Sequence, residues 1–173
     1  PFHPYQSAPA RMAIRACERW AARRCHAMIS VADRMTELMV AGRVAPAEKF
    51  TTILSGMEVE PFLESDRLRQ RARRELGYTP DQIVIVKVAR LFHLKGHEYL
   101  VRAAEQVVQT VPNARFLLVG DGILQDRIRR QIETAGLAEH FQFTGLVPPE
   151  RIPELLAASD LVDVALVEHV EHV

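Results

Sequence analysis

From residue 82 onward, the sequence alternates between short apolar runs and longer amphipathic segments. The apolar runs predict strands at residues 83–89, 115–119, 141–144 and 161–167, and the segments between them predict helices at residues 97–110, 123–135 and 148–158. Strands that alternate with helices of this length form parallel sheets with right-handed crossovers. The sequence therefore predicts an α/β fold, a Rossmann-like parallel sheet with helices on both faces.

The first of these strands leads into a short basic loop. Residues 83–96 read IVIVKVARLFHLKG, and the apolar, mostly β-branched start is typical of a strand covered on both faces. Arg90 and Lys95 follow, and Gly96 comes just before the next helix. Two cations at the carboxyl end of a buried strand, beside a helix N-terminus, indicate a phosphate-binding site. His93 and His97 flank the pair, and both a ligand contact and a loop or capping role are open to them.

Two further strand ends should lie along the same edge of the sheet. Residues 120–122 read Gly-Asp-Gly, and residues 145–147 read Gly-Leu-Val. Ligands of open α/β sheets bind at the carboxyl ends of the strands, so both segments are candidates for the same site. Gly120 and Gly122 lack the third glycine of a dinucleotide-binding fingerprint. They either permit a tight turn or let a ligand approach the backbone, and the residues leave both interpretations open.

The first 80 residues predict a separate, smaller set of elements. We expect helices at residues 10–26, 33–41 and 67–76, and strands at residues 27–32 and 49–54. Asp33 is a plausible N-cap, and the arginine-dense third helix is expected to be a solvated surface element. Pro61 lies in a connecting segment, which indicates a domain boundary between residues 1–60 and 61–173.

Four arginines recur every four residues on the first predicted helix: Arg11, Arg15, Arg19 and Arg23. Residues at this spacing form one stripe along a helix. The stripe is either a solvated face or a surface for peripheral contact with an anionic membrane or an acidic partner.

Composition excludes several classes of protein. The 173 residues carry 22 basic and 22 acidic side chains, a balance that argues against a dedicated nucleic-acid-binding protein. No apolar run reaches the ~18 residues of a membrane span. Cys17 and Cys25 would lie roughly 12 Å apart on one helix, too far for a disulfide, which fits a reducing compartment. We therefore expect a cytoplasmic protein, and a chain that starts at Pro1 is expected to be a piece of a longer one.

The carboxyl-terminal segment VEHVEHV places His169 and His172 three residues apart, beside Glu168 and Glu171. Two histidines without a defined scaffold are too weak a pattern for a metal site, and none is predicted.

The motifs in combination resemble a known family. The segments VARLFHLKGHEYLVRAA, PNARFLLVGDG and GLAEHFQFTGLVPPERIPELLAASDL are similar to the C-terminal half of family 4 retaining glycosyltransferases, over about residues 83–162. Residues 27–63 resemble the end of the N-terminal domain more weakly. The resemblance implies a GT-B fold, with a nucleotide-sugar donor between two Rossmann-like domains. Residues 1–60 would end the acceptor-side domain, and residues 61–173 would form most of the nucleotide-sugar-binding domain.

The resemblance also implies roles for single residues. Arg90 and Lys95 match the basic pair that holds the donor diphosphate and stabilises it as it leaves, a reaction that requires no metal or other cofactor. The loop of Gly145, Leu146 and Val147 matches the segment that contacts the nucleobase. The donor-binding set that the sequence suggests is completed by two glycines, Gly56 near the domain junction and Gly120.

The chain also departs from the family pattern. The family continues into a loop with two glutamates that bind the donor sugar and ribose, but residues 163–173 do not match it. Glu168 and Glu171 are too close together to be that pair. Three alternatives stay open: a fragment of a retaining glycosyltransferase with an unknown acceptor, a non-catalytic nucleotide-binding or interaction module, and a GT-B sugar-nucleotide epimerase.

Overall fold

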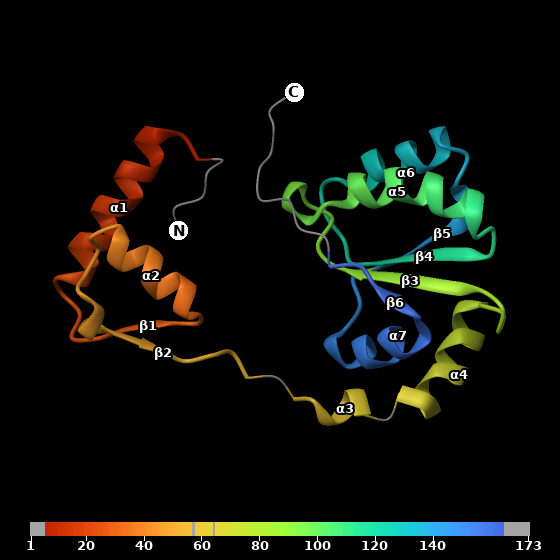
Figure 1. Cartoon of the computed structure of the whole chain (residues 1–173), viewed down its shortest axis with the longest axis horizontal. Coiled ribbons are helices and arrows are strands. Elements are labelled where there is room, and N and C mark those ends of the chain that lie inside the picture. Colours follow the sequence, from red (N-terminus) through yellow and green to blue (C-terminus); the bar gives the residue numbers. More distant parts are fainter. Residues whose placement is uncertain (1–5, 57, 64, 165–173) are drawn as a thin grey trace. The chain divides into compact units, whose positions relative to one another are not determined.

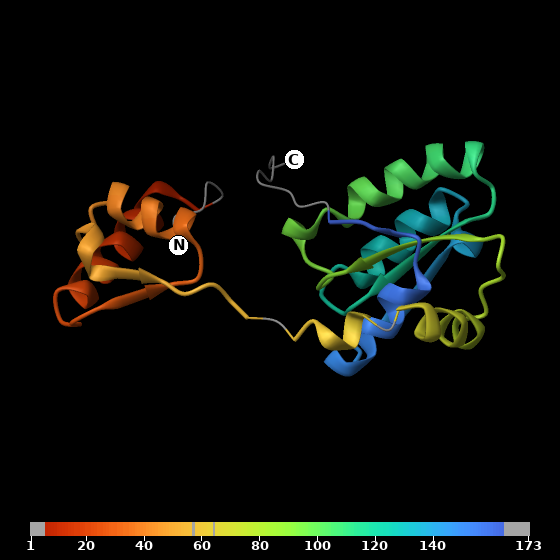
Figure 2. The same cartoon turned by 60° about the horizontal axis from the view of Figure 1, so that its bottom comes forward.

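The computed structural model describes residues 6–56, 58–63 and 65–164. The chain divides into two compact units, Pro1–Glu58 and Val59–Val173 (Figures 1 and 2). The assignment of residues 1–60 and 61–173 to an acceptor-side and a nucleotide-sugar-binding domain stays a prediction. The predicted tail motif at residues 168–172 lies outside the described residues.

The first unit holds a two-stranded parallel sheet and two helices. Its elements are α1 (Ala8–Ala22), β1 (Met28–Ser30), α2 (Asp33–Ala41), a short 3-10 turn (Ala47–Lys49) and β2 (Phe50–Thr52). Ala22, Met39 and Val44 form its buried core. The predicted cap of α2 is wrong, because Ala32 occupies the N-cap position without a side-chain bond. Asp33 instead lies in the first turn, where its negative charge favours the helix dipole.

One arginine of the predicted stripe has a structural role in this unit. The guanidinium of Arg19 donates to the carbonyls of Gly42 and Arg43, at 3.0 Å and 2.8 Å. Those carbonyls lie just after α2, where a helix leaves its last acceptors unpaired. Arg19 therefore ties α1 to the end of α2.

The second unit is a four-stranded parallel sheet with helices on both faces (Figure 1). Its strands are β3 (Ile83–Val88), β4 (Ala114–Val119), β5 (Phe141–Gly145) and β6 (Leu161–Val162), in the order β5-β4-β3-β6. Its helices are α3 (Glu60–Leu63), α4 (Ser65–Leu76), α5 (His97–Thr110), α6 (Gln125–Thr134) and α7 (Ile152–Ala158), with 3-10 turns at His93–Lys95, Ala138–His140 and Pro149–Arg151. The predicted α/β class and parallel sheet are confirmed.

Alternate residues along the strands supply two separate cores. Phe116 and Leu118 of β4 pack toward α5 and α6, whereas Leu117 and Val119 pack toward Leu155 of α7. This alternation follows from the two-residue period of a strand. Figure 1 shows α5 and α6 on one face of the sheet and α4 and α7 on the other.

Helix α4 is not the solvated surface element that its arginines predict. Arg73 is 7% exposed, and its guanidinium donates to the carbonyls of Thr79, Gln82 and Ala158 and to Asp160. Asp160 also accepts from Arg69 at 2.5 Å and from the Val84 N–H at 2.8 Å. Because a guanidinium carries five fixed donors, Arg73 is buried with several of them satisfied.

No helix in the described part of the chain is both long and apolar enough to cross a membrane.

Candidate functional site

The strand order creates a topological switch point beside β3. From β3 the chain adds β4 and then β5 on one side, and α7 then carries it back to place β6 on the other side of β3. Open α/β sheets bind ligands in the crevice outside the strand ends at such a point. A cavity of about 350 Å³ lies there, lined by Lys87, Val88, Ala89, Lys95, Ile152, Leu156, Val162, Asp163 and Val164. The fold therefore offers a ligand site at the end of β3.

Residues 89–96, the basic loop, run from β3 to α5 at this position. Leu91 anchors the loop, because its side chain is fully buried, its N–H donates to the Asp121 carbonyl at 2.9 Å and its carbonyl accepts from the Leu124 N–H at 3.1 Å. Gly96 adopts φ +67°, a left-handed conformation that starts α5. The basic loop is thus attached near its start, at Leu91, to the loop after β4.

The two predicted cations sit on either side of that anchor. Arg90 is exposed and Lys95 is half-buried. Within the described residues, neither side chain forms a hydrogen bond or an ion pair. Lys95 also lines the switch-point cavity. The basic loop therefore presents two positive charges that no carboxylate neutralises in this part of the chain.

Gly120 and Gly122 serve a close approach between two loops. A Cβ atom on Gly120 would lie 2.2 Å from the Ala89 carbonyl oxygen, and one on Gly122 would lie 2.4 Å from the Leu91 carbonyl oxygen. The absence of side chains lets the loop after β4 pack directly on the basic loop. A role for Gly120 in ligand approach stays a prediction.

The loop after β5 lies at the same edge of the sheet. The Gly145 carbonyl accepts from the Gly120 N–H at 3.0 Å and from the Thr144 hydroxyl at 2.9 Å. Leu146 is 84% exposed, and Val147 packs against the core on the α7 side. Leu146 is therefore the accessible side chain of the predicted nucleobase segment. Gly56 belongs to the first unit, where it is exposed and a Cβ would meet no atom within 4 Å.

Two buried charged or titratable groups lie near the crevice. The sequence alone does not single out Lys87, and it leaves the role of His97 open. Lys87, on β3, is 2% exposed and forms an ion pair with Asp163 at 2.8 Å. Its only sequence signal is a charge inside the apolar run IVIVKV. His97 is 3% exposed, and its Nε2 lies 3.0 Å from the Arg90 carbonyl oxygen. Burial lowers the pKa of His97, and the nearby charges of Lys87 and Lys95 lower it further. The hydrogen bond to the Arg90 carbonyl raises this pKa, but by less than burial lowers it.

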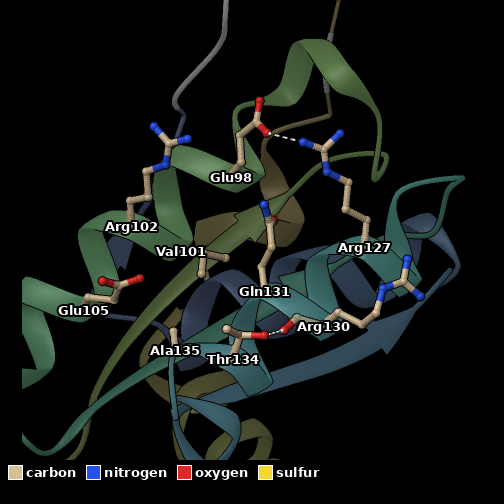
Figure 3. A pocket seen from close by; sticks show the side chains of 9 residues that line it. All are labelled: Glu98, Val101, Arg102, Glu105, Arg127, Arg130, Gln131, Thr134 and Ala135. Carbon is tan, nitrogen blue, oxygen red and sulfur yellow. Dashed lines mark hydrogen bonds and ion pairs between the residues drawn. The ribbon is translucent and has the colours of Figure 1, made fainter. Parts of the chain in front are cut away.

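A second, larger cavity of about 500 Å³ lies between α5 and α6 (Figure 3). It is lined by Glu98, Val101, Arg102, Glu105, Arg127, Arg130, Gln131, Thr134 and Ala135. Glu98 and Arg127 reach toward each other and form an ion pair at 3.4 Å. Both signs of charge line this groove, so it lacks the uncompensated positive charge of the basic loop.

The family is decided by residues 69–172, which match the model of the glycosyl transferases group 1. The chain belongs to this family. Its similar relatives include the 2-deoxystreptamine N-acetyl-D-glucosaminyltransferase of Streptomyces fradiae. That protein is 30% identical over an alignment of 154 residues, which covers 86% of this chain and 36% of that protein. The GDP-mannose-dependent alpha-(1-6)-phosphatidylinositol monomannoside mannosyltransferase of Mycolicibacterium smegmatis is 28% identical over 78% of this chain and 35% of that protein. The chain thus spans about a third of the length of these relatives.

Solved structures agree on the fold. Anabaena HepE in complex with UDP and glucose matches with a TM-score of 0.74 at 24% identity, over 93% of this chain and 43% of that chain. WaaG, a glycosyltransferase involved in lipopolysaccharide biosynthesis, matches with a TM-score of 0.67 at 20% identity, over 78% of this chain and 36% of that chain. The fold of the chain matches that of GT-B structures.

Proposed function

We propose that this chain is part of a family 4 retaining glycosyltransferase, which transfers a hexosyl group from a nucleotide-sugar donor to an acceptor. The observation that carries the proposal is the uncompensated pair Arg90 and Lys95, on a loop at the topological switch point. The names of the relatives, among them an N-acetylglucosaminyltransferase and a mannosyltransferase, support the reaction class. The second unit would bind the donor.

In the proposed reaction, the basic loop stabilises the departing nucleoside diphosphate. The bond between the sugar carbon and the diphosphate oxygen breaks, and the diphosphate gains negative charge. Arg90 offers two parallel N–H donors to phosphate oxygens, and Lys95 offers a mobile point charge. The N–H groups of the first turn of α5 add partial positive charge. Interactions that strengthen as this charge grows lower the barrier, and these groups can supply them without a metal or other cofactor.

The remaining donor contacts follow from the strand ends. Leu146 is exposed at the end of β5, which supports a contact with the nucleobase by the segment that also contains Gly145 and Val147. Gly120 and Gly56 remain proposed donor-site glycines. Retention of configuration and the hexosyl class of donor rest on the sequence resemblance and are part of the proposal.

A second candidate is a non-catalytic nucleotide-binding module. The same observation supports it, because Arg90 and Lys95 would hold a diphosphate whether or not a sugar is transferred. Both candidates bind a nucleoside diphosphate, and only the enzyme turns over a sugar donor. Hydrolysis of nucleotide sugars by the chain, followed by chromatography of the released nucleotide, distinguishes them.

The arginine stripe of α1 supports a proposal of peripheral contact with an anionic membrane from the cytoplasm. The proposal rests on the combined positive charge of the stripe. Arg11 and Arg19 also donate to backbone carbonyls, so Arg23, which is exposed, is the residue to substitute. Vesicles of phosphatidylglycerol should bind the chain more strongly than neutral vesicles at low salt, and substitution of Arg23 with Gln should reduce the difference. Equal binding to both vesicles would overturn this contact.

Calorimetric titration with UDP, GDP, ADP and the corresponding nucleosides tests the diphosphate site. Arg90→Ala and Lys95→Ala should each weaken diphosphate binding roughly 10- to 100-fold, the equivalent of one charge-assisted hydrogen bond. Binding of the bare nucleoside should change less than about twofold, because nucleosides carry no phosphate charge. Arg102→Ala, which removes an exposed arginine of α5 outside the basic loop, is the matched control.

Two results would contradict the proposal. If the wild-type chain bound no diphosphate at millimolar concentration, neither the enzyme nor the binding module would stand. If Arg90→Ala and Lys95→Ala weakened nucleoside and diphosphate binding equally, the pair would have a structural role instead.

A further inference from the structure

His97 occupies an unusual position for a histidine at the start of a helix. It is the first residue of α5, directly after the left-handed Gly96, and its ring is buried rather than facing solvent. Its Nε2 lies 3.0 Å from the carbonyl oxygen of Arg90, seven residues earlier. A single side chain thus connects the two ends of the basic loop.

The contact fixes the tautomer of the ring. A carbonyl oxygen can only accept, so the Nε2 atom of His97 must carry the proton. The other nitrogen, Nδ1, is buried and has no hydrogen-bond partner among the described residues. A proton on Nδ1 would add a buried charge without an acceptor, which is costly. The geometry therefore selects a neutral ring that donates through Nε2.

Both cations near the ring also favour its neutral form. Lys87 on β3 and Lys95 on the basic loop both oppose a positive charge on His97, and Asp163, after β6, favours it. Asp163 is already paired with Lys87 at 2.8 Å. On the α6 side, a small cavity places His97 near Glu98 and Arg127, which also pair with each other. These neighbours leave no unpaired carboxylate to stabilise a charged ring.

The bond to Arg90 acts on the residue that carries the exposed guanidinium. The Arg90 carbonyl accepts from the Phe92 N–H at 2.8 Å and from His97. The next peptide is fixed by the bonds of Leu91 to the loop after β4. The backbone on the carboxyl side of the Arg90 Cα is therefore held by His97, and the direction of the Arg90 side chain depends on that peptide.

We propose that His97 is a positioning residue: its Nε2–H, bonded to the Arg90 carbonyl, holds the basic loop in the conformation that directs Arg90 and Lys95 toward the donor diphosphate. This inference rests on the proposed function of the pair. It assigns His97 no contact with the donor and no proton transfer.

The test compares two substitutions that differ in one hydrogen-bond donor. His97→Leu keeps an apolar side chain of similar bulk and removes the donor, whereas His97→Gln restores an N–H at a similar distance from the backbone. Calorimetry with the nucleoside diphosphate that the wild-type chain binds most tightly should show a loss of about tenfold for His97→Leu, as expected for one hydrogen bond. His97→Gln should recover affinity to within about threefold of wild type. Binding of the bare nucleoside should stay unchanged in both.

His140→Leu is the matched control. The His140 ring also contacts a backbone carbonyl, that of Ala114 at 2.9 Å, but at the opposite edge of the sheet, where β4 and β5 begin. Its loss should lower stability without changing diphosphate affinity. A wild-type chain that binds no diphosphate would overturn the proposed function. A wild-type chain that binds, with an equal affinity for His97→Leu, would overturn only the role of His97.

A measurement on the wild-type chain covers the case in which His97→Leu does not fold. Nitrogen-15 NMR of labelled histidine should show a neutral His97 ring with the proton on Nε2 at pH 7. A ring protonated on Nδ1 would overturn the proposal without any variant.

Discussion

Gly120→Ala should loosen the attachment between the basic loop and the loop after β4. Gly120 has φ +136°, and a Cβ there would lie 2.2 Å from the Ala89 carbonyl oxygen and 3.0 Å from its carbon. Real Cβ atoms essentially never come closer than 3.0 Å to another heavy atom. The backbone must therefore separate by about 0.8 Å, the difference between 3.0 Å and 2.2 Å, where β3 and β4 end.

The loss in free energy of unfolding for Gly120→Ala follows from the conformational cost and from the hydrogen bonds near Gly120. A left-handed conformation costs a residue with a Cβ about 1–2 kcal/mol. The separation would also break or stretch two backbone hydrogen bonds, from Ala89 N–H to Val119 and from Gly120 N–H to Gly145, both 3.0 Å. At about 1 kcal/mol each, they bring the expected loss to about 3–4 kcal/mol.

Gly77→Ala isolates the steric part of this effect. Gly77 also has a positive φ, +78°, but a Cβ there would meet no atom within 4 Å. Gly77→Ala should therefore lower the free energy of unfolding only by the conformational cost, about 1–2 kcal/mol. Urea unfolding, followed by circular dichroism and by hydrogen exchange of the β3 and β4 amides, measures the difference. If the two variants lost stability to within about 0.5 kcal/mol of each other, the steric reasoning would be refuted.

Two further predictions concern charge. Asp160→Asn should reduce the free energy of unfolding by about 2 kcal/mol, because buried Arg73 loses its charged partner. The Asp160 carboxylate is one-third exposed, which limits the loss. In urea unfolding, the control Glu98→Gln, which breaks an exposed ion pair, should lose less than about 0.5 kcal/mol. Burial lowers the pKa of His97 from 6.5, so the unfolded chain binds more protons just below pH 6.5. Stability should be fully present above that pH and fall as the pH drops toward the lower pKa of the folded state. For His97→Gln, the free energy of unfolding measured over the same pH range should lack this decrease. If the curves of wild type and variant ran parallel from pH 7.5 to 5, the prediction would be wrong.

Local sequence patterns were sufficient to predict the elements that carry the site. The helix predicted at residues 97–110 is α5 at those bounds, because an amphipathic segment lies between the left-handed Gly96 and Pro112. The strands after it were also found, since each is a β-branched or aromatic run that ends at a glycine or a proline-rich turn. With strands all parallel, their carboxyl ends had to meet at one edge.

The environment of individual charges could not be predicted in the same way. The sequence of α4, SDRLRQRARREL, holds five arginines, and only the packing of α4 against α7 decides that Arg73 is buried while Arg71 is exposed. The environment of Lys87 likewise depends on Asp163, which directly follows β6 and lies 76 residues later in the chain. Both partners are too distant in sequence for any local period to relate them.

The acidic residues around β6 explain why the basic loop is left positive. Among the described residues, strand β6 pairs with β3 at two positions, and carboxylates on both sides of it add side-chain bonds. Asp160, just before it, binds Arg69 and Arg73, and Asp163, just after it, binds Lys87.

These carboxylates are committed to cations that join α4 and β3 to β6. Arg90 and Lys95 have no such partner in the described chain, so a sequence of zero net charge still presents local positive charge at the switch point. A structural cation is paired where the chain folds over it. Arg90 and Lys95 are cations beside a ligand crevice whose partner the described residues do not supply, and the proposed donor diphosphate would be that partner.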